Sequence, residues 1–232
     1  MTNPDTTSDA AIEGVLFDLD GTLVDTAPDM VDALIRLQRM HGAAALAYEL
    51  VRSNVSNGAA GLVRLAFPDA DDELHTALHG SYLQLYQDVL CERSRVFPGL
   101  DRLLDELDEK RRPWGVVTNK PQRLTEPLLG KLGLLERVAC AISGDTLPQR
   151  KPHPAPMLLA SRLMNVAPGS ILYVGDAARD IEAGHAAGMT TIAAGYGYIT
   201  ADDDPQRWSA DAIAASPEDL RRLVRAAVRL DS

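Results

Sequence analysis

Short apolar runs occur along the chain, and each one stops at a polar or small residue. Such runs are typical of strands that are buried on both faces of a sheet. Between the later runs, apolar residues recur every three or four positions, as on a helix with one buried face. The predicted strands cover residues 15–17, 114–117, 138–142, 171–174 and 190–193, and the predicted helices cover residues 121–132, 155–165 and 179–187. This alternation predicts an α/β fold, a Rossmann-like parallel sheet with helices on both faces.

Residues 25–95 depart from this pattern because they show helical spacing only. Apolar residues recur at that spacing over residues 30–41, 62–67 and 72–91, and no alternating strand pattern interrupts them. The first of these helices is expected to begin just after Thr26, a capping residue that stands ahead of a proline and an aspartate. The segment therefore predicts an all-helical insertion.

The mixed pattern resumes with four leucines on one helical face within residues 100–107. We expect a core domain made of residues 1–24 and 96–232, with residues 25–95 inserted as a smaller helical domain. Arginines alternate with apolar residues in the last predicted helix, and we expect them to form its solvated face. The apolar residues that this helix is expected to bury are Leu220, Leu223, Val224, Ala227 and Val228.

The overall charge limits the kinds of partner that the protein can bind. The 232 residues carry a formal net charge of −10, and the sequence pI is about 4.9. A chain this acidic is a poor candidate for binding nucleic acid or an anionic membrane through a broad basic face. A phosphate site in such a chain needs local positive charge. The oligomeric state cannot be predicted from the sequence.

Other sequence features bear on the cellular location. Cys91 and Cys140 are too few for a disulfide framework or a metal cluster, and they are interpreted as free thiols in a reducing compartment. No run of about 18 apolar residues is present, so no membrane span is expected. Residues 1–10 are polar, do not form a secretory signal, and are expected to be a disordered tail. A cytoplasmic protein is expected.

Two carboxylates end the first predicted strand. Asp18 and Asp20 follow the run 15–17 directly, and Gly21 then turns the chain. Ligands of open parallel sheets bind at the carboxyl ends of the strands, and paired carboxylates there favour a hard cation such as Mg²⁺. The alternative is that Asp18 caps the strand and that Asp20 and Gly21 form an ordinary turn.

Polar residues also follow the second and third predicted strands of the core. Thr118 and the backbone N–H of Asn119 suit a phosphoryl oxygen, although a lone threonine is more often a helix N-cap. Lys151 stands just before a helix start, where a cation and the helix dipole both attract an anion. Its alternative is a surface lysine in a proline-rich turn.

The fourth predicted strand of the core ends at Asp176, with Asp180 about one helical turn later. Asp176 is expected to complete a carboxylate cluster with Asp18 and Asp20, although a structural aspartate at a strand end is the simpler alternative. Each of these signals is weak by itself. Their order along the chain, each after its own apolar run, is far more specific.

This series resembles the four motifs of the haloacid dehalogenase superfamily, and the resemblance covers nearly the whole chain. The insertion is similar to the small C1-type cap domain of that superfamily. Within it, the chain most resembles the phosphoglycolate phosphatases and the N-acetylmuramic acid 6-phosphate phosphatases. The residues that carry this finer likeness are 114–121, Glu126, Pro127, 175–176, 179–182 and 196–199.

The resemblance implies a Mg²⁺-dependent phosphomonoesterase that works through an aspartyl-phosphate. Asp18 is then the nucleophile and Asp20 the general acid and base. The implied Mg²⁺ ligands are the Asp18 and Asp176 side chains and the Asp20 backbone carbonyl, with Asp180 orienting metal waters or the lysine. The groups implied to hold the phosphoryl oxygens are Thr118, the Asn119 N–H and Lys151.

A cap domain is expected to close over the site and to bind the organic part of the substrate. The polar loop 52–60 is the candidate for that contact, with Arg52 and Asn57 as substrate-binding residues; an ordinary interhelical loop is an equal alternative. The predicted substrate is a small phosphorylated metabolite. The first candidate is 2-phosphoglycolate and the second is N-acetylmuramic acid 6-phosphate.

Two other functions remain open at this stage. A phosphomutase that resembles the β-phosphoglucomutases uses the same core motifs, but its cap has to exclude water from the intermediate. A phospho-accepting receiver domain also places aspartates at strand ends with Mg²⁺. Its acceptor follows a later strand, and a receiver is shorter and lacks an insertion of this length.

Overall fold

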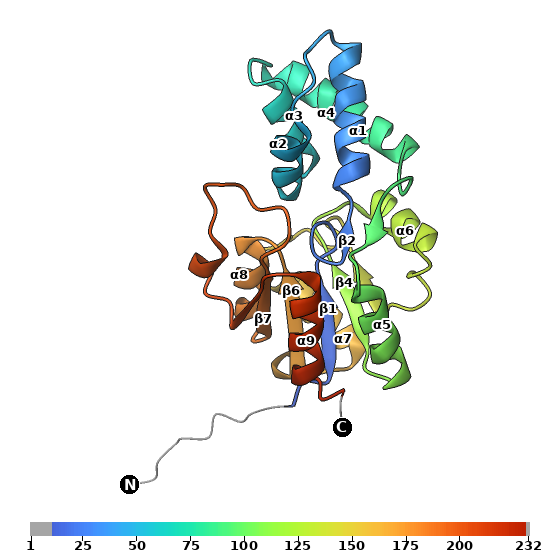
Figure 1. Cartoon of the computed structure of the whole chain (residues 1–232), viewed down its shortest axis with the longest axis vertical. Helices are drawn as coiled ribbons and strands as arrows, with labels where there is room; N and C mark the ends of the chain where they lie inside the picture. Colours follow the sequence, from blue (N-terminus) through green and yellow to red (C-terminus); the bar gives the residue numbers. More distant parts are fainter. Residues whose placement is uncertain (1–10, 231–232) are drawn as a thin grey trace.

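The computed structural model describes residues 11–230 and shows a six-stranded sheet at the centre of the core (Figure 1). The predicted tail, residues 1–10, lies outside the described residues. Every neighbouring pair of strands is parallel, in the order β5-β4-β1-β6-β7-β8. The strands are β1 (Gly14–Phe17), β4 (Trp114–Val117), β5 (Cys140–Ile142), β6 (Ile171–Gly175), β7 (Thr190–Ala194) and β8 (Ala212–Ala214). The predicted parallel α/β fold is confirmed.

Helices cover both faces of this sheet because successive side chains of a strand point to opposite sides. Val15 and Phe17 of β1 pack in one cluster of buried residues, whereas Leu16 packs in another. The first cluster contains the apolar faces of α5 (Leu100–Glu109), α6 (Gln122–Lys131) and α9 (Pro217–Ala227). The second contains those of α7 (Ala155–Met164) and α8 (Ala178–Ala186).

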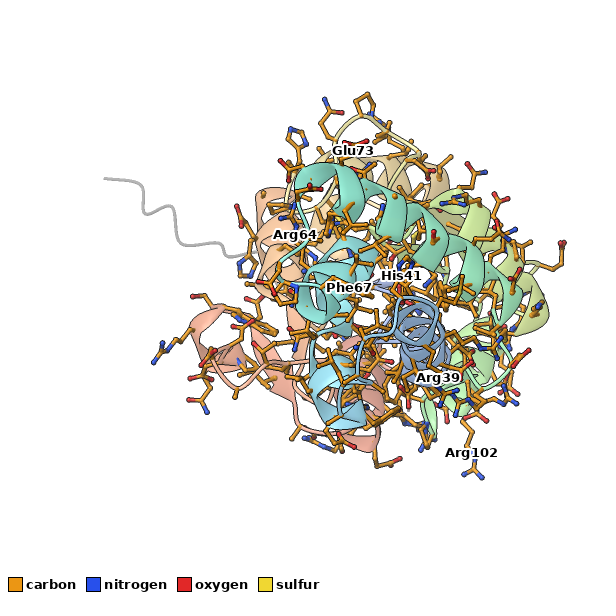
Figure 2. All side chains as sticks on the ribbon, turned by 90° about the horizontal axis from the view of Figure 1, so that it is seen from above. Arg39, His41, Arg64, Phe67, Glu73 and Arg102 are labelled. Atoms are coloured by element: carbon orange, nitrogen blue, oxygen red, sulfur yellow. The ribbon has the colours of Figure 1, made fainter. Side chains whose placement is uncertain are left out.

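Four helices form a separate layer above the carboxyl ends of the strands (Figure 1). We call this layer the cap; it consists of α1 (Ala27–Met40), α2 (Tyr48–Ser53), α3 (Gly58–Ala66) and α4 (Asp72–Asp88), with a 3₁₀ turn at Val55–Asn57. Leu34, Leu62 and Leu78 are buried between its helices. The far end of the cap carries Arg39, Arg64 and Glu73, as the view from above shows (Figure 2).

A short antiparallel ribbon connects the cap to the core. It pairs β2 (Val24–Asp25) with β3 (Arg95–Val96). The expectation that residues 25–95 are helical throughout is therefore wrong at both ends. Strands of two residues are too short to show a period in the sequence. The domain boundaries expected at 24/25 and 95/96 both fall within this ribbon.

Other differences from the sequence-based expectations are small. The three-residue strand β8 was not predicted, and β5 begins at Cys140 rather than at residue 138. Thr26 stands at the N-cap of α1 but makes no side-chain cap bond, because its hydroxyl donates to Asp20 Oδ1 instead. Within residues 11–230, no helix has the length and apolarity needed to cross a membrane. Cys91 and Cys140 are free thiols, and the cytoplasmic location stays a prediction.

Candidate active site

The turn after β1 brings the first pair of carboxylates to the edge of the sheet. The Asp18 N–H donates to the Val174 carbonyl of the neighbouring strand at 2.8 Å, which extends the β1–β6 pairing to Asp18. Gly21 follows with φ +83°, and a Cβ there would lie 2.2 Å from Asp176 Oδ2. Only glycine allows this turn, since it combines a positive φ with a close approach to a carboxylate. The turn thereby brings the carboxyl ends of β1 and β6 together.

Three buried carboxylates meet at this edge. One oxygen each of Asp18, Asp176 and Asp180 lies within 4.8 Å of the others. Burial, and then the charges of Asp18 and Asp180, raise the pKa of Asp176 to about 8. Like charges this close need a cation to be ionised together. Oxygen ligands of this kind fit a hard divalent metal.

Lys151 makes direct ion pairs with two carboxylates of this cluster. Its Nζ lies 2.9 Å from Asp18 Oδ1 and 2.7 Å from Asp180 Oδ1, and it donates to the Val117 carbonyl and the Tyr173 hydroxyl. Burial opposes its charge, but the two carboxylates outweigh burial and raise the pKa of Lys151. The interpretation of Lys151 as a surface residue is wrong, since only 4% of it is exposed.

The guanidinium of Arg179 lies close enough for the three carboxylates to raise its pKa, but two cations do not balance three carboxylates. Although Asp18 Oδ1 lies within ion-pair distance of Lys151, it accepts no well-aligned hydrogen bond and is fully buried. A carboxylate oxygen without an aligned donor keeps a lone pair for a metal ion. The residues present therefore fit a divalent metal, although the carboxylate of Asp20 is directed elsewhere and Asp180 takes its place in the cluster.

Thr118 and Asn119, which follow β4, contact the backbone at Lys120 and at Lys151. The Asn119 side chain donates to the Lys151 carbonyl at 3.1 Å and accepts from the Lys151 N–H at 3.2 Å. Thr118 is buried and accepts from the Lys120 N–H at 3.2 Å. The alternative interpretation of Thr118 as a helix cap is wrong, since the N-cap of α6 is Pro121.

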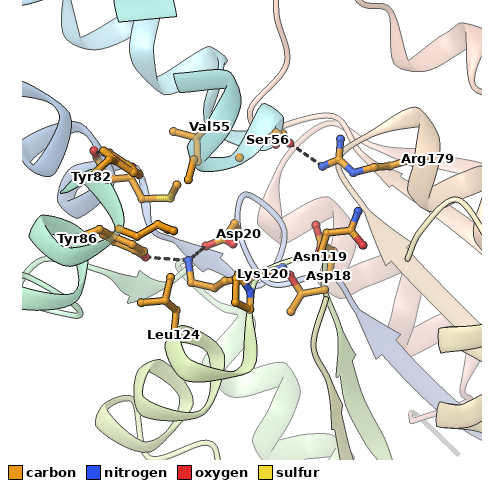
Figure 3. Close-up of a pocket in the computed structure, with 16 residues that line it drawn as sticks. Asp18, Asp20, Val55, Ser56, Tyr82, Tyr86, Asn119, Lys120, Leu124 and Arg179 are labelled. Carbon is orange, nitrogen blue, oxygen red and sulfur yellow. Dashed lines mark hydrogen bonds and ion pairs between the residues drawn. The ribbon is translucent and has the colours of Figure 1, made fainter. Parts of the chain in front are cut away.

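The side chain of Asp20 is held by a separate set of groups. Its Oδ1 accepts from the Thr26 hydroxyl at 2.7 Å and from Lys120 Nζ at 2.9 Å. The same ammonium donates to the Tyr86 hydroxyl of α4 at 2.9 Å and lies 4.5 Å from the centre of that ring. Figure 3 shows Asp20 and Tyr86 converging on Lys120. A core lysine thus connects Asp20 to the cap.

A small cavity of about 110 Å³ opens between the core and the cap (Figure 3). Asp18, Asp20 and Thr118 line its core side, and apolar and aromatic cap residues such as Val55 and Tyr86 line the opposite side. We call it the inner cavity. A polar floor with carboxylates and a largely apolar roof are typical of small-molecule sites.

A larger cavity of about 520 Å³ adjoins it, which we call the outer cavity. Arg179, Asn119 and Ser56 line both cavities, so the two lie next to each other. Arg150 and the cap residue His79 line only the outer cavity.

The loop expected to contact substrate reaches the site through Ser56. Its hydroxyl donates to Asp176 Oδ2 at 2.7 Å, and its carbonyl accepts from Arg179 at 2.7 Å (Figure 3). Asn57 lines the outer cavity, where its amide donates to Asn54 at 3.1 Å. These contacts connect the cap loop directly to the carboxylate cluster.

Arg52 lies elsewhere in that loop region. Its guanidinium stands 4.9 Å from the Tyr198 ring centre and 4.0 Å from Asp25, beside the ribbon, and it lines neither cavity. The structure gives no support to Arg52 as a substrate-binding residue, because the α2 backbone directs it toward the connection with the core. The role of Asn57 stays a prediction.

Sequence reasoning did not single out four residues that the structure places at the site: Ser56, Tyr86, Lys120 and Arg179. Lys120 and Arg179 stand next to motif residues, and that adjacency was a usable signal. Ser56 lies within the cap loop 52–60 that was predicted to contact the substrate, whereas Tyr86 lies on α4, where no local pattern marks it.

Comparisons with known proteins agree with this geometry. The sequence model of a family described as haloacid dehalogenase-like hydrolase matches residues 15–194. The chain is 41% identical over 220 residues to an N-acetylmuramic acid 6-phosphate phosphatase of Pseudomonas putida, covering 94% of this chain and 98% of the relative. It is 41% identical over 206 residues to a phosphoglycolate phosphatase of Xanthomonas campestris pv. campestris, covering 89% and 93%.

Solved structures give the same result. A crystal structure of a predicted phosphoglycolate phosphatase from Haemophilus somnus superposes with a TM-score of 0.82 at 26% identity, covering 94% of this chain and all of the other. The arrangement of core and cap is thus shared with an experimentally determined structure.

Proposed function

Because the chain belongs to the haloacid dehalogenase-like hydrolase family, we propose that it is a magnesium-dependent phosphatase with Asp18 as nucleophile and Asp20 as general acid and base. Hydrolysis of phosphoric monoesters is the activity that its phosphatase relatives support. The observation that carries the assignment to residues is the buried cluster of Asp18, Asp176 and Asp180 beside Lys151, which reaches the inner cavity through Asp18.

The proposed reaction has two displacements at phosphorus. In the first, an Asp18 oxygen forms a bond to phosphorus, the ester oxygen leaves, and Asp20 gives that oxygen its proton. In the second, Asp20 takes a proton from water, the water oxygen bonds to phosphorus, and the bond to Asp18 breaks. Inorganic phosphate and the free alcohol are the products.

The chain's own groups prepare both steps. Two donors hold Asp20 Oδ1, which leaves Oδ2 to exchange protons at the inner cavity. Thr118, the Asn119 N–H and Lys151 are positioned at the strand ends to balance charge on the phosphoryl oxygens. The apolar cap residues over the cavity exclude water other than the reacting one.

We propose Mg²⁺ as the cofactor, held by Asp18 and Asp176 with the Asp20 backbone carbonyl. Asp180 then orients Lys151 or metal waters. When bound, the ion offsets repulsion between the carboxylates and the phosphate and polarises a phosphoryl oxygen. Members of the family generally use a divalent metal, and oxygen-only ligands favour Mg²⁺.

For the substrate we propose a small phosphorylated metabolite that also carries a carboxylate. The names of the relatives include phosphoglycolate and N-acetylmuramic acid 6-phosphate, and both molecules fit this description. Identity does not choose between them, since it is 41% to each kind of relative. A β-phosphoglucomutase-like structure at 24% identity shares the fold and adds no support for a mutase.

The test is release of inorganic phosphate from p-nitrophenyl phosphate and from a panel of phosphorylated metabolites. We expect Mg²⁺-dependent release by the wild type and a loss of about a thousandfold or more in Asp18→Asn, since an amide is a poor nucleophile. Asp202→Asn, which changes an exposed carboxylate away from both cavities, serves as control. Full activity in Asp18→Asn, or after exhaustive chelation, would refute the proposal.

A further inference from the structure

The lining of the outer cavity has an unusual charge composition. The chain has 33 acidic and 23 basic residues, yet neither aspartate nor glutamate lines this cavity within residues 11–230. Its polar side chains are Arg150, Arg179, His79, Asn57, Asn119 and Ser56. A concave surface with cations and no carboxylates attracts anions even in an acidic protein.

Arg150 has unused hydrogen-bonding capacity. Its side chain is exposed and makes no ion pair or hydrogen bond with the part of the chain that the structure describes. A guanidinium presents donors in a planar fork that matches a carboxylate. Arg179, in contrast, already donates to the Ser56 carbonyl at 2.7 Å. Arg150 is therefore the group best suited to a ligand in this cavity.

His79 of α4 provides a second donor from the cap. Burial, followed by the charges of His75 and Arg123, lowers its pKa. A lowered pKa favours the neutral ring, which donates one N–H without adding a charge that has to be balanced. A ligand held between Arg150 and His79 contacts the core and the cap at the same time.

We propose that the outer cavity binds the carboxylate of the substrate, with Arg150 as its main partner and His79 as a cap donor. This inference rests on the proposed phosphatase function, because the phosphoryl group has to occupy the inner cavity. The cation proposed to recognise the substrate is thus Arg150 and not Arg52.

The sizes of the cavities define the substrate class further. The inner cavity is about 110 Å³, below the range of roughly 300–1,000 Å³ that is usual for ligand sites, whereas the outer cavity is about 520 Å³. A two-carbon phosphoester occupies the inner cavity and leaves the outer one to water. A phosphorylated sugar acid, whose carboxylate is many bonds from the phosphate, extends into both. The geometry thus favours a phosphorylated sugar acid over 2-phosphoglycolate.

The test compares two sugars that differ mainly in the carboxylate. N-acetylmuramic acid 6-phosphate carries a lactyl carboxylate that N-acetylglucosamine 6-phosphate lacks, and p-nitrophenyl phosphate lacks both sugar and carboxylate. We expect the wild type to prefer the acid at least tenfold in kcat/KM. Arg150→Ala should lower kcat/KM for the acid by about tenfold to a hundredfold, the usual effect of a hydrogen bond to a charged group, and change the other two less than twofold.

Two further variants separate recognition from structure. Arg150→Lys keeps the charge and should retain part of the preference. Arg102→Ala removes an exposed arginine of α5 (labelled in Figure 2) that lines neither cavity, and it should change none of the three activities. Thermal unfolding midpoints equal to that of the wild type show that each variant is folded.

Each result that would contradict the proposal identifies which part of it is wrong. Equal loss of all three activities in Arg150→Ala, or no preference for the acid in the wild type, would overturn the carboxylate site while leaving the phosphatase function intact. Faster turnover of 2-phosphoglycolate than of the sugar acid would overturn the inferred substrate class. Absence of phosphate release even from p-nitrophenyl phosphate would refute the proposed function and this inference together.

Discussion

Each carboxylate of the site has its own partners, and these determine its chemistry. Asp18 lines the inner cavity, and its buried Oδ1, beside Lys151, lacks a hydrogen bond, which suits contact with a metal. Asp180 is bonded to Lys151, the Tyr173 hydroxyl and a backbone N–H, so its oxygens are largely saturated. The same side chain type therefore serves as a reactive group at one position and as a support at another.

Replacing Gly21 tests the close approach of the turn after β1 to Asp176 at the end of β6. In Gly21→Ala the new Cβ meets Asp176 Oδ2 at 2.2 Å, and φ is +83°. We expect a loss of about 1–3 kcal/mol in the free energy of unfolding and a higher Mg²⁺ requirement, measured by denaturant unfolding and by metal titration of activity.

Gly42→Ala is the matched control for this substitution. Gly42 also has a positive φ, +67°, but a Cβ there meets nothing within 4 Å. Gly42→Ala should therefore destabilise the protein only through backbone strain and leave the Mg²⁺ requirement unchanged. Equal effects of the two substitutions on the metal requirement would show that the contact with Asp176 is unimportant.

At the scale of elements, Lys120 connects α4 of the cap to the turn after β1. Its ammonium holds Asp20 and the Tyr86 hydroxyl at 2.9 Å each. We expect Lys120→Met to lower kcat/KM for alkyl phosphates about tenfold or more, within the range of general acid–base catalysis. The loss should be smaller for p-nitrophenyl phosphate, whose leaving group needs little protonation.

Tyr86→Phe should show the same dependence on the leaving group in weaker form, because it removes only the hydroxyl that holds Lys120. Tyr82→Phe is the matched control, since Tyr82 is equally buried, stacks on Tyr86 at 6.3 Å and donates to the Met30 carbonyl instead. Both variants should lose about 1 kcal/mol of stability. If Tyr82→Phe alters the leaving-group dependence as strongly, the effect comes from cap packing and not from Lys120.

At the scale of the whole molecule, metal binding, protonation and stability are coupled. Without metal, burial and the charges of Asp18 and Asp180 raise the pKa of Asp176 from 3.8 to about 8. The folded state then holds a proton that the unfolded state releases above about pH 4. The free energy of unfolding of the metal-free protein should therefore fall between about pH 4 and pH 8 through this group.

A divalent metal displaces that proton, so its stabilising effect should grow as pH rises toward 8. We expect Mg²⁺ to raise the thermal unfolding midpoint more at pH 8 than at pH 6, measured at constant ionic strength. Asp176→Asn, which cannot be deprotonated, should abolish the difference between the two pH values. A Mg²⁺ shift that is independent of pH in the wild type would contradict this coupling.

The sequence alone determined the architecture of the core and two residues of the carboxylate cluster, Asp18 and Asp176, whereas Asp180 takes the place predicted for Asp20. Each core strand is a local apolar run, and each run is followed by its motif residue, so the pattern could be recognised without knowledge of distant contacts. Because parallel strands present their carboxyl ends at one edge, Asp18, Thr118, Lys151 and Asp176 had to converge. Family membership and phosphatase activity followed from the same residues and are confirmed by the comparisons.

Only the tertiary structure decided which side chains of the cap reach that edge. Ser56 contacts Asp176 across 120 positions of sequence, and Lys120 contacts Tyr86 across 34, and no local period encodes such pairs. Arg52 was chosen for its place in a polar loop, yet helix direction turns it toward Tyr198, while Arg150 reaches the outer cavity from the core. Orientation of a side chain depends on how its element packs, and packing is a property of the folded chain as a whole.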